Sequence, residues 1–521
     1  MKSFIFLIIS VLLIACNPHI QENQVTVIPV PVSLEVRKGS FEIDQQTKII
    51  PGIQEMNEMA SYLTDFIKTS YGIALEVEGT DKVKSNFILI KLDTTDEELG
   101  DEGYRLKAEK KGITISAAKP AGIFYGIQTF KQLIRKDNNG ATVPAVDITD
   151  YPRFRWRGYL LDPARHFRTK DEIKRYIDLI ALCKMNTMQL HLTDDQGWRL
   201  EIRKYPELTL KGSLSDNSGR KGSGWYYTQE DIRELVQYAE SRFVTLVPEI
   251  EMPGHSLSAT SVYPHLGCEG QPASELCVSK ETTGQFSRDV LTEVMSLFPS
   301  PYIHVGADEV RPERWRSCPS CSLKIRQMLS ADPENNLLSH NVKVTSGAGM
   351  PYHKDISLLQ GWYNRGIDRH ISASNRRMVG WDEIMDGGLD RTSNAIVMAW
   401  RSEDAIRGAI RLGRNVIVSL YPDYYLDNDL SLERTYTFDP VPAGLSSEEE
   451  KLILGVQGNM WGEGTPTVKE IDQRTFPRLA AIAETGWSQP SGKDFPSFTD
   501  RLKPFGALLE TFGVLTEGWK E

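Results

Sequence analysis

After its N-terminal segment, the 521-residue sequence has no hydrophobic run long enough to span a bilayer. It also has no block of lysines and arginines, and its formal net charge is −10, which argues against a nucleic-acid partner. Hydrophobic residues make up 40% and charged residues 25% of the chain, as in ordinary soluble globular proteins. The length is sufficient for one large domain and a smaller one.

The N-terminus carries the one strongly apolar segment. Lys2 precedes an apolar run that is too short for a comfortable membrane-spanning helix and is typical of a signal peptide. Leu13-Ile14-Ala15-Cys16 resembles a bacterial lipobox, so residues 1–16 are predicted to be a lipoprotein signal peptide with Cys16 as the lipidated first mature residue. A plain secretory signal with a chance cysteine is the alternative. Residues 17–24 are polar and are predicted to be a tether, which implies an exported protein anchored by lipid to a bacterial membrane, periplasmic or at the cell surface.

The other five cysteines give no clear metal signature. Export permits disulfides, and Cys268 with Cys277 and Cys318 with Cys321 are plausible local pairs, whereas Cys183 lies on an apolar helical face. Cys318-Pro-Ser-Cys321 could be half of a zinc site, but the sequence places no second ligand pair nearby. We therefore expect local disulfides or free thiols, no metal and no cofactor.

Residues 25–150 have a mixed pattern that predicts a small α+β accessory domain without recognisable chemistry. Helical spacing predicts helices over Met56–Tyr71, which runs into Gly72, and over Gly122–Leu133. The predicted strands are Val27–Pro31, Phe41–Ile43, Phe87–Ile90 and Ile113–Ser116.

Residues 151–521 alternate between strand-like and helix-like segments. Capping-box patterns at Thr169 and Thr228 mark two helix starts. Eight such βα units favour a (β/α)8 TIM barrel over an open doubly wound sheet, and no glycine-rich phosphate loop follows the first strand. The predicted strands are Gly158–Asp162, Thr187–Thr193, Val244–Ile250, Tyr302–Ala307, Met378–Trp381, Ala395–Trp400, Val416–Leu420 and Ile453–Gln457.

Carboxylates and aromatic residues follow these strands. The active site of a TIM barrel lies at the C-terminal ends of its strands, so these side chains are expected to converge on one face. Aromatic rings stack on the C–H face of a pyranose and carboxylates accept its hydroxyls, so the combination predicts a carbohydrate site. A single tryptophan at a strand end is more often packing, and the inference rests on the joint placement. The residues are Asp162, Arg165, His166, Asp194, Asp195, Trp198, Arg199, Glu249, Glu251, His255, Asp308, Glu309, Trp381, Asp382, Glu383, Trp400, Arg401, Tyr424, Tyr425, Asp427, Trp461 and Glu463.

The adjacent pair Asp308-Glu309 is mechanistically informative. Neighbouring strand residues point to opposite faces, so both can reach one pocket only if the chain bends there. The acid and nucleophile of an ordinary retaining glycosidase flank the scissile bond from opposite sides. If both residues act from the same side, the nucleophile must come from elsewhere, and the substrate itself is one source.

The run His304-Val-Gly-Ala-Asp-Glu309 resembles the signature of glycoside hydrolase family 20, the β-N-acetylhexosaminidases. The resemblance extends in family order over residues 155–487, and the preceding α+β unit is similar to the family's accessory domain. The further matching runs are His191–Arg199, Pro248–His255, Gly380–Glu383, Tyr425–Asp427 and Gln457–Glu463.

The resemblance implies an exo-acting retaining enzyme that removes terminal N-acetylglucosamine or N-acetylgalactosamine by substrate-assisted catalysis. Glu309 would be the general acid and base, Asp308 would hold the acetamido N–H, and Tyr425 would bind the acetamido oxygen. Asp194 and His255 would form a polar network behind Glu309. The implied sugar-binding residues are Arg165, Asp427 and Glu463 for the hydroxyls and Trp381, Trp400 and Trp461 for the walls.

The chain departs from the family pattern between Cys321 and Gln360, where no helix is expected and Ser346–Gly349 is predicted to be a flexible insertion. Two other functions remain as alternatives. A metal-dependent amidohydrolase would need a His-x-His pair after the first strand, where Asp162-Pro-Ala-Arg165 stands instead. A non-catalytic, surface glycan-binding lipoprotein would not need the acid groups. The sequence does not indicate an oligomeric state.

Overall fold

The computed structural model describes residues 25–79, 84–137, 140–213, 224–331, 354–516 and 519. The predicted signal peptide, the tether, Cys16 and the predicted insertion at 346–349 lie outside these residues. Within them, no helix combines the length and the apolar composition needed to cross a membrane.

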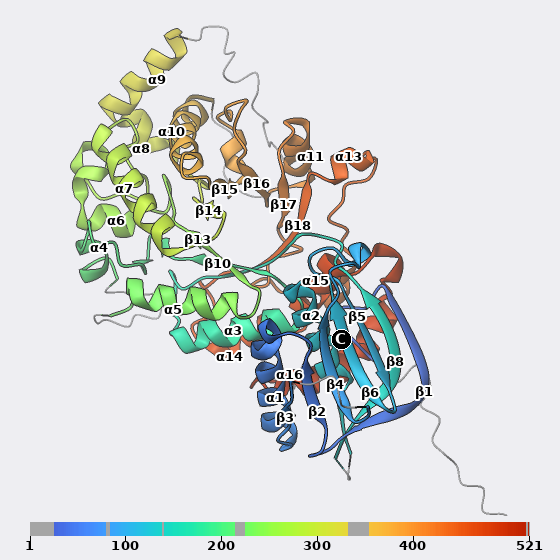
Figure 1. The fold of residues 1–521 in the computed structure, drawn as a ribbon. Helices are drawn as coiled ribbons and strands as arrows, with labels where there is room; N and C mark the ends of the chain where they lie inside the picture. The colour runs from blue at the N-terminus through green and yellow to red at the C-terminus, as the bar shows by residue number, and fades with distance from the viewer. Residues whose placement is uncertain are drawn as a thin grey trace, which may run out of the picture.

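The first unit is a mixed sheet with helices packed against it, at the lower right of Figure 1. Helix α1 (Asn57–Tyr71) ends at Gly72, whose φ of 74° provides the left-handed C-terminal residue common at helix ends. Helix α2 (Pro120–Leu133) is buried along nearly its whole length. The strand order is β1 (Ser33–Ile43), β8 (Gly140–Asp150), β5 (Tyr104–Glu109), β6 (Gly112–Ala117), β4 (Phe87–Leu92), β2 (Lys48–Pro51) and β3 (Glu76–Val77), with β7 (Arg135–Asp137) paired to β8.

The prediction of a strand at Val27–Pro31 is wrong. Two prolines in five residues leave too few N–H donors for a sheet ladder. The segment instead bonds to side chains from distant helices: the Gln132 side chain bonds both the N–H and the C=O of Ile28, at 2.8 and 2.6 Å, and Glu484 accepts from the Val30 N–H at 2.9 Å. These contacts fasten the N-terminal segment to α2 and to the C-terminal helices.

The second unit is a closed barrel of eight parallel strands, as predicted (Figure 1). All eight predicted runs contain a strand, with shifted ends. The fourth strand stops at His304 because Gly306 and Ala307 have φ values of 62° and 72°, outside the extended region. The strands are β9 (Trp156–Leu161), β10 (Thr187–His191), β13 (Thr245–Glu249), β14 (Tyr302–His304), β15 (Arg377–Trp381), β16 (Ile396–Ala399), β17 (Val416–Val418) and β18 (Ile453–Met460); β11 (Thr193–Asp194) and β12 (Gly197–Trp198) form a separate hairpin.

Helices surround the barrel, and both predicted capping boxes are present, at Thr169 and Thr228. The expectation that no helix occurs between Cys321 and Gln360 is wrong, since α9 continues to Ala331 and α10 begins at Lys354. The helices are α3 (Lys170–Leu182), α4 (Glu207–Leu210), α5 (Gln229–Glu240), α6 (Leu257–Val262), α7 (Glu281–Leu297), α8 (Pro312–Ser317), α9 (Pro319–Ala331), α10 (Lys354–Ser372), α11 (Glu403–Arg411), α12 (Leu432–Thr437), α13 (Ser447–Glu450), α14 (Val468–Thr475), α15 (Arg478–Trp487) and α16 (Phe495–Glu510).

Buried ion pairs join the two units. The Arg157 guanidinium, at the start of the barrel, donates to both carboxylate oxygens of Glu102 at 2.9 and 2.7 Å. Lys184 lies 2.7 Å from the Asp150 carboxylate with both side chains fully buried, and Trp487 donates to the same carboxylate at 2.9 Å. Breaking such pairs leaves an uncompensated buried charge, so the sheet and the barrel are held as one packed body.

Candidate active site

A cavity of about 350 Å³ lies at the C-terminal end of the barrel strands. This is the end at which TIM barrels carry their active sites. A larger cavity of about 630 Å³ lies at the opposite end, near the first residues of β9, β10, β13 and β14. Residues at that end of a TIM barrel usually serve stability and not catalysis. The smaller cavity is lined by Arg165, His255, Asp308, Glu309, Trp400, Tyr421, Tyr425, Asp427, Trp461 and Glu463.

The chain bends sharply at the adjacent acids, as expected. Ala307 and Glu309 both have positive φ, at 72° and 48°, and the two carboxyl groups therefore line the same cavity. Gly306 permits the bend because its φ is 62° and a Cβ there would lie 1.8 Å from a Glu251 carboxylate oxygen. Non-glycine residues with such backbone angles are strained and concentrate at functional sites.

Asp308 is a buried carboxyl group with an incomplete set of partners. Its Oδ1 has no hydrogen-bond partner among the described residues, while Oδ2 lies 3.7 Å from His255 Nε2. Burial raises the pKa of Asp308 to about 6, with the nearby His255 lowering it and the neighbouring Glu309 raising it. A buried acceptor without a donor is costly, so this oxygen is poised to accept an N–H from a bound molecule.

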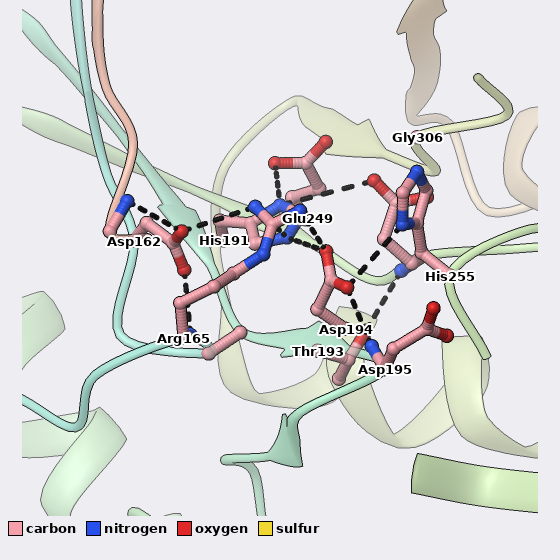
Figure 2. A network of polar contacts seen from close by, with 12 residues as sticks. Asp162, Arg165, His191, Thr193, Asp194, Asp195, Glu249, His255 and Gly306 are labelled. Atoms are coloured by element: carbon pink, nitrogen blue, oxygen red, sulfur yellow. Dashed lines mark hydrogen bonds and ion pairs between the residues drawn. The ribbon is translucent and has the colours of Figure 1, made fainter. Parts of the chain in front are cut away.

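His255 lies between the two acids and Asp194, a carboxylate deeper in the barrel, and Figure 2 shows its contact with Asp194. Its Nε2 lies 3.7 Å from Glu309 Oε2, and its Nδ1 lies 3.4 Å from Asp194 Oδ1. Burial alone would lower the pKa of His255, but Asp194 and Asp308 raise it to about 9, so the imidazole is a cation at neutral pH. Asp194 is therefore located behind the two acids, where the family resemblance places it.

A second histidine extends this network toward the barrel axis. His191 bonds Asp194 through Nε2 and Glu249 through Nδ1, both at 2.7 Å (Figure 2). Glu249 also accepts from Trp381 Nε1 at 3.0 Å. Burial lowers the pKa of His191, but Glu249 and Asp194 raise it to about 10. The pKa of Glu251, two residues after Glu249, is held well above the usual range. Its causes are burial and the nearby carboxylates of Asp308, Glu249 and Asp194.

Two clusters of side chains in this network contain the residue types that bind metal ions. One is His191 with Glu249 and Glu251, and the other is Asp194 with Asp195 and His255. In the first group, however, both His191 nitrogens already bond carboxylates, and Gln189 donates to Glu249 at 2.7 Å. His191 and Glu249 are therefore already partnered, whereas both carboxylate oxygens of Glu251 have no hydrogen-bond partner among the described residues. The His191–Glu249 pair is suited to orienting the residues in front of it.

Aromatic side chains form the walls. Trp400 and Tyr425 are stacked with ring centroids 6.3 Å apart, and Trp461 is tilted against Tyr425 at 6.3 Å. Burial and the nearby Asp308 hold the pKa of Tyr425 well above its usual value, so its phenol remains a hydrogen-bond donor. Trp381 does not line the cavity; it is 1% exposed and lies 5.9 Å from the Trp461 ring.

The run at Trp198-Arg199, which follows the second barrel strand, has a structural role instead. The Trp198 indole donates to Leu200 O at 2.7 Å inside the core, and neither residue lines the cavity. Arg199 donates to the carbonyl of Ala164 at 2.7 Å. Arg199 thus holds the segment that carries Arg165, whereas Trp198 bonds within its own segment. The expectation that Trp198 belongs to a converging aromatic set is wrong.

Polar residues form the rim. Arg165 pairs with Asp194 at 2.8 Å, with Asp162 at 3.1 Å and with Glu463 at 3.3 Å, and its guanidinium lies 5.0 Å from the Trp461 ring. Glu463 is 55% exposed at the cavity mouth. Burial raises the pKa of Asp427 to about 6, and its Oδ1 has no partner within the described part of the chain.

Sequence reasoning did not single out Tyr421, which lines the cavity and packs edge-on against Tyr425 at 5.3 Å. It also missed the part that Glu383 plays, since this residue accepts from the Trp400 indole at 3.0 Å and so orients a wall of the cavity. Tyr421 follows the seventh strand and Glu383 follows the fifth. These positions could have predicted that both residues lie at the cavity, because residues after the strands lie at the C-terminal end of the barrel.

Known proteins resemble the chain over nearly its full length. The model of glycosyl hydrolase family 20, catalytic domain, matches residues 154–490, and that of domain 2 of the same family matches residues 24–151. A beta-hexosaminidase of Porphyromonas gingivalis is 34% identical over 542 residues, which is 96% of this chain and 66% of the relative. The chain thus spans about two thirds of that relative's length.

Two solved structures have the same fold. The exo-β-N-acetylglucosaminidase of Vibrio harveyi in complex with N-acetylglucosamine superposes with a TM-score of 0.82 and 29% identity, covering 96% of this chain and 80% of that one. The β-N-acetylhexosaminidase of Bacteroides fragilis superposes with a TM-score of 0.77 and 28% identity, covering 94% and 96%. The fold, the site geometry and the matched models agree with the resemblance found in the sequence, and the chain belongs to glycosyl hydrolase family 20.

Proposed function

We propose that the chain is an exo-acting, retaining β-N-acetylhexosaminidase that removes terminal N-acetylglucosamine or N-acetylgalactosamine from glycans, with the substrate's acetamido group as the nucleophile. The observation that carries the proposal is the buried Asp308 Oδ1, which lacks a donor among the described residues and adjoins Glu309 in one cavity. An acetamido N–H supplies the donor. A plain hexose has no group in that position that could serve as the internal nucleophile.

In the first step, the acetamido carbonyl oxygen attacks the anomeric carbon while Glu309 donates a proton to the glycosidic oxygen. The aglycone leaves as an alcohol, and the sugar becomes a cyclic oxazolinium ion. Asp308 accepts the acetamido N–H and stabilises the developing positive charge. The Tyr425 phenol donates to the acetamido oxygen and aligns it with the anomeric carbon.

In the second step, the Glu309 carboxylate removes a proton from water, which attacks the anomeric carbon from the face that the aglycone left. Two inversions at this carbon give net retention. The His255 cation lies 3.7 Å from both acids, where it balances the negative charge of Asp308 and the charge that Glu309 gains when it donates its proton. The buried carboxylates Asp194 and Glu249 keep the two histidines charged and in place.

The cavity size supports removal of a single terminal sugar. At about 350 Å³ it lies at the lower end of the usual range for ligand sites, which suits one pyranose ring. Trp400 and Trp461 supply apolar faces, while Asp427, Glu463 and Arg165 bring hydrogen-bonding groups to the sugar hydroxyls. Such a pocket closes around a chain end and does not accommodate the interior of a polymer.

A comparison of two aryl glycosides tests the function. The N-acetyl-β-glucosaminide is expected to be cleaved, with the β-anomer as the first-formed product by NMR, whereas the β-glucoside, without the internal nucleophile, is cleaved only at background rate. EDTA in the assay leaves the rate unchanged, because no step uses a metal. Equal cleavage of both glycosides contradicts the substrate-assisted mechanism, and binding of N-acetylglucosamine without any cleavage favours the glycan-binding alternative.

We also propose that the protein is exported and anchored by lipid at Cys16, a position that lies outside the described residues. The lipobox-like run at residues 13–16 and the polar stretch behind it support this location. In the producing bacterium, the wild-type protein is expected in the membrane fraction and Cys16→Ser in the soluble fraction or in uncleaved form. A wild-type protein recovered entirely in the soluble fraction contradicts the anchor.

A further inference from the structure

Four cysteines that are distant in the sequence meet at one buried point. Cys268 and Cys277 lie in the segment between β13 and α7, and Cys318 and Cys321 lie at the start of α9. Their exposed fractions are 4%, 0%, 2% and 0%, and the four sulfurs lie within 4.8 Å of one another. The sequence-based expectation that no second ligand pair lies near Cys318 and Cys321 is therefore wrong, because the barrel brings two consecutive βα segments together.

The sulfur separations match a tetrahedral metal site and do not match disulfides. Cys277 Sγ lies 3.6 Å from Cys321 Sγ and 3.8 Å from Cys318 Sγ, and Cys268 Sγ lies 3.9 Å from Cys321 Sγ. With Zn–S bonds of about 2.3 Å, the corners of a tetrahedron are about 3.8 Å apart. A disulfide needs an S–S separation of about 2.0 Å, and all four cysteines of the cluster are free thiols.

We propose that Cys268, Cys277, Cys318 and Cys321 bind one structural zinc ion with four thiolate ligands. Soft thiolates in a closed, buried tetrahedron select zinc, and four protein ligands leave no open position for a water or substrate. The site is therefore structural and not catalytic. The hydroxyls of Ser279 and Ser320 lie 3.2 Å from the sulfurs of Cys321 and Cys318, within hydrogen-bond reach of these ligand atoms.

The site joins the two segments that carry the active-site acids and His255. Beyond β13 the chain passes through His255 before it reaches Cys268 and Cys277, and beyond β14 it passes through Asp308 and Glu309 before it reaches α8 and α9. These helices lie on the side of the barrel away from the N-terminal sheet (Figure 1).

Direct bonds carry the connection toward the cavity. Leu276, next to Cys277, donates from its N–H to Pro253 O at 2.8 Å, and the Trp315 indole donates to Leu276 O at 2.9 Å. A metal between the two segments therefore holds the spacing between His255 and the acids, which the active site requires within a few tenths of an ångström.

Metal analysis of the full chain tests the proposal. The wild-type protein is expected to contain about one zinc ion per chain after dialysis. Cys277→Ser and Cys321→Ser lose that zinc, whereas Cys183→Ser, which changes a fully buried cysteine outside the cluster, retains it. Growth with Co²⁺ yields a protein with the sulfur-to-cobalt charge-transfer and visible bands of a tetrahedral thiolate site.

Thiol mapping on the wild-type protein provides a readout that does not depend on the variants folding. Alkylation of the native protein is expected to spare all four cysteines, and alkylation after denaturation with a chelator is expected to modify all four without any disulfide-linked peptide. Wild-type protein without zinc, with iron in its place, or with Cys268–Cys321 or Cys277–Cys318 disulfides overturns the assignment. So does a Cys277→Ser variant that folds and keeps its zinc.

Discussion

Replacing Asp308 by asparagine is expected to lower kcat on N-acetyl-β-glucosaminides by on the order of 10²–10³, the loss typical when one preorganised electrostatic group is removed from a transition state. The loss extends to activated aryl substrates, because Asp308 acts on the acetamido nucleophile and not on the leaving group. Asparagine preserves the shape but offers no negative charge to the oxazolinium ion. The measurement is steady-state kinetics on a series of aryl glycosides.

The same carboxyl group is expected to set the acidic limb of the pH profile. Its pKa is raised to about 6 by burial, so below that pH it is increasingly protonated and kcat/KM falls about tenfold per pH unit. In Asp308→Asn this limb is lost. Asp427→Asn is the matched control, because Asp427 also lines the cavity with a pKa raised to about 6 but is proposed to bind the sugar hydroxyls and not the acetamido group. An Asp308→Asn enzyme with wild-type kcat, or with an unchanged limb near pH 6, contradicts this role.

Replacing Glu309 by glutamine is expected to produce a loss that depends on the leaving group. General acid catalysis contributes about 10²–10⁴ to such steps, so alkyl and oligosaccharide aglycones lose most of their turnover. A dinitrophenyl aglycone leaves without a proton, so its release is expected as a rapid burst followed by a slow steady state. The slow phase arises because no base remains to activate water.

Added azide distinguishes this role from a general loss of structure. Azide attacks without losing a proton, so it is expected to accelerate the slow phase of Glu309→Gln and to yield the β-glycosyl azide. Glu463→Gln is the matched control, since Glu463 also lines the cavity but pairs with Arg165 at the rim. It should raise KM without any dependence on the leaving group. A Glu309→Gln enzyme that loses the same factor on every substrate contradicts the assignment.

The sequence predicted the barrel well because each strand is a short apolar run and the alternation with capped helices is regular. The segment Tyr302–Ala307 shows where the apolar pattern no longer predicts the structure. The pattern continues through Ala307, but the strand ends at His304. Pattern alone does not report the positive φ values at Gly306 and Ala307, which depend on the packing of Glu251 and on the bond from the Gln360 side chain to Ala307 O at 2.6 Å. That bend is what directs both acids into one cavity.

The aromatic residues show the same division. Trp198 and Trp400 both follow barrel strands, yet Trp198 packs in the core and Trp400 lines the cavity. Their side-chain directions depend on partners far along the chain, Leu200 O in one case and Glu383 in the other. Local sequence contains no information about such partners until the strands are arranged in the barrel.

The sequence by itself determined the (β/α)8 barrel, the accessory domain and the convergence of Asp308, Glu309, Tyr425 and His255 at one end, because parallel strands in a closed barrel all finish on the same face. The tertiary structure alone decided which charges those residues carry and which cysteines meet. The pKa of His255 depends on Asp194, which lies sixty-one positions earlier, and the four-cysteine cluster spans residues 268–321. Both depend on distances between segments that the chain brings together only when the barrel closes.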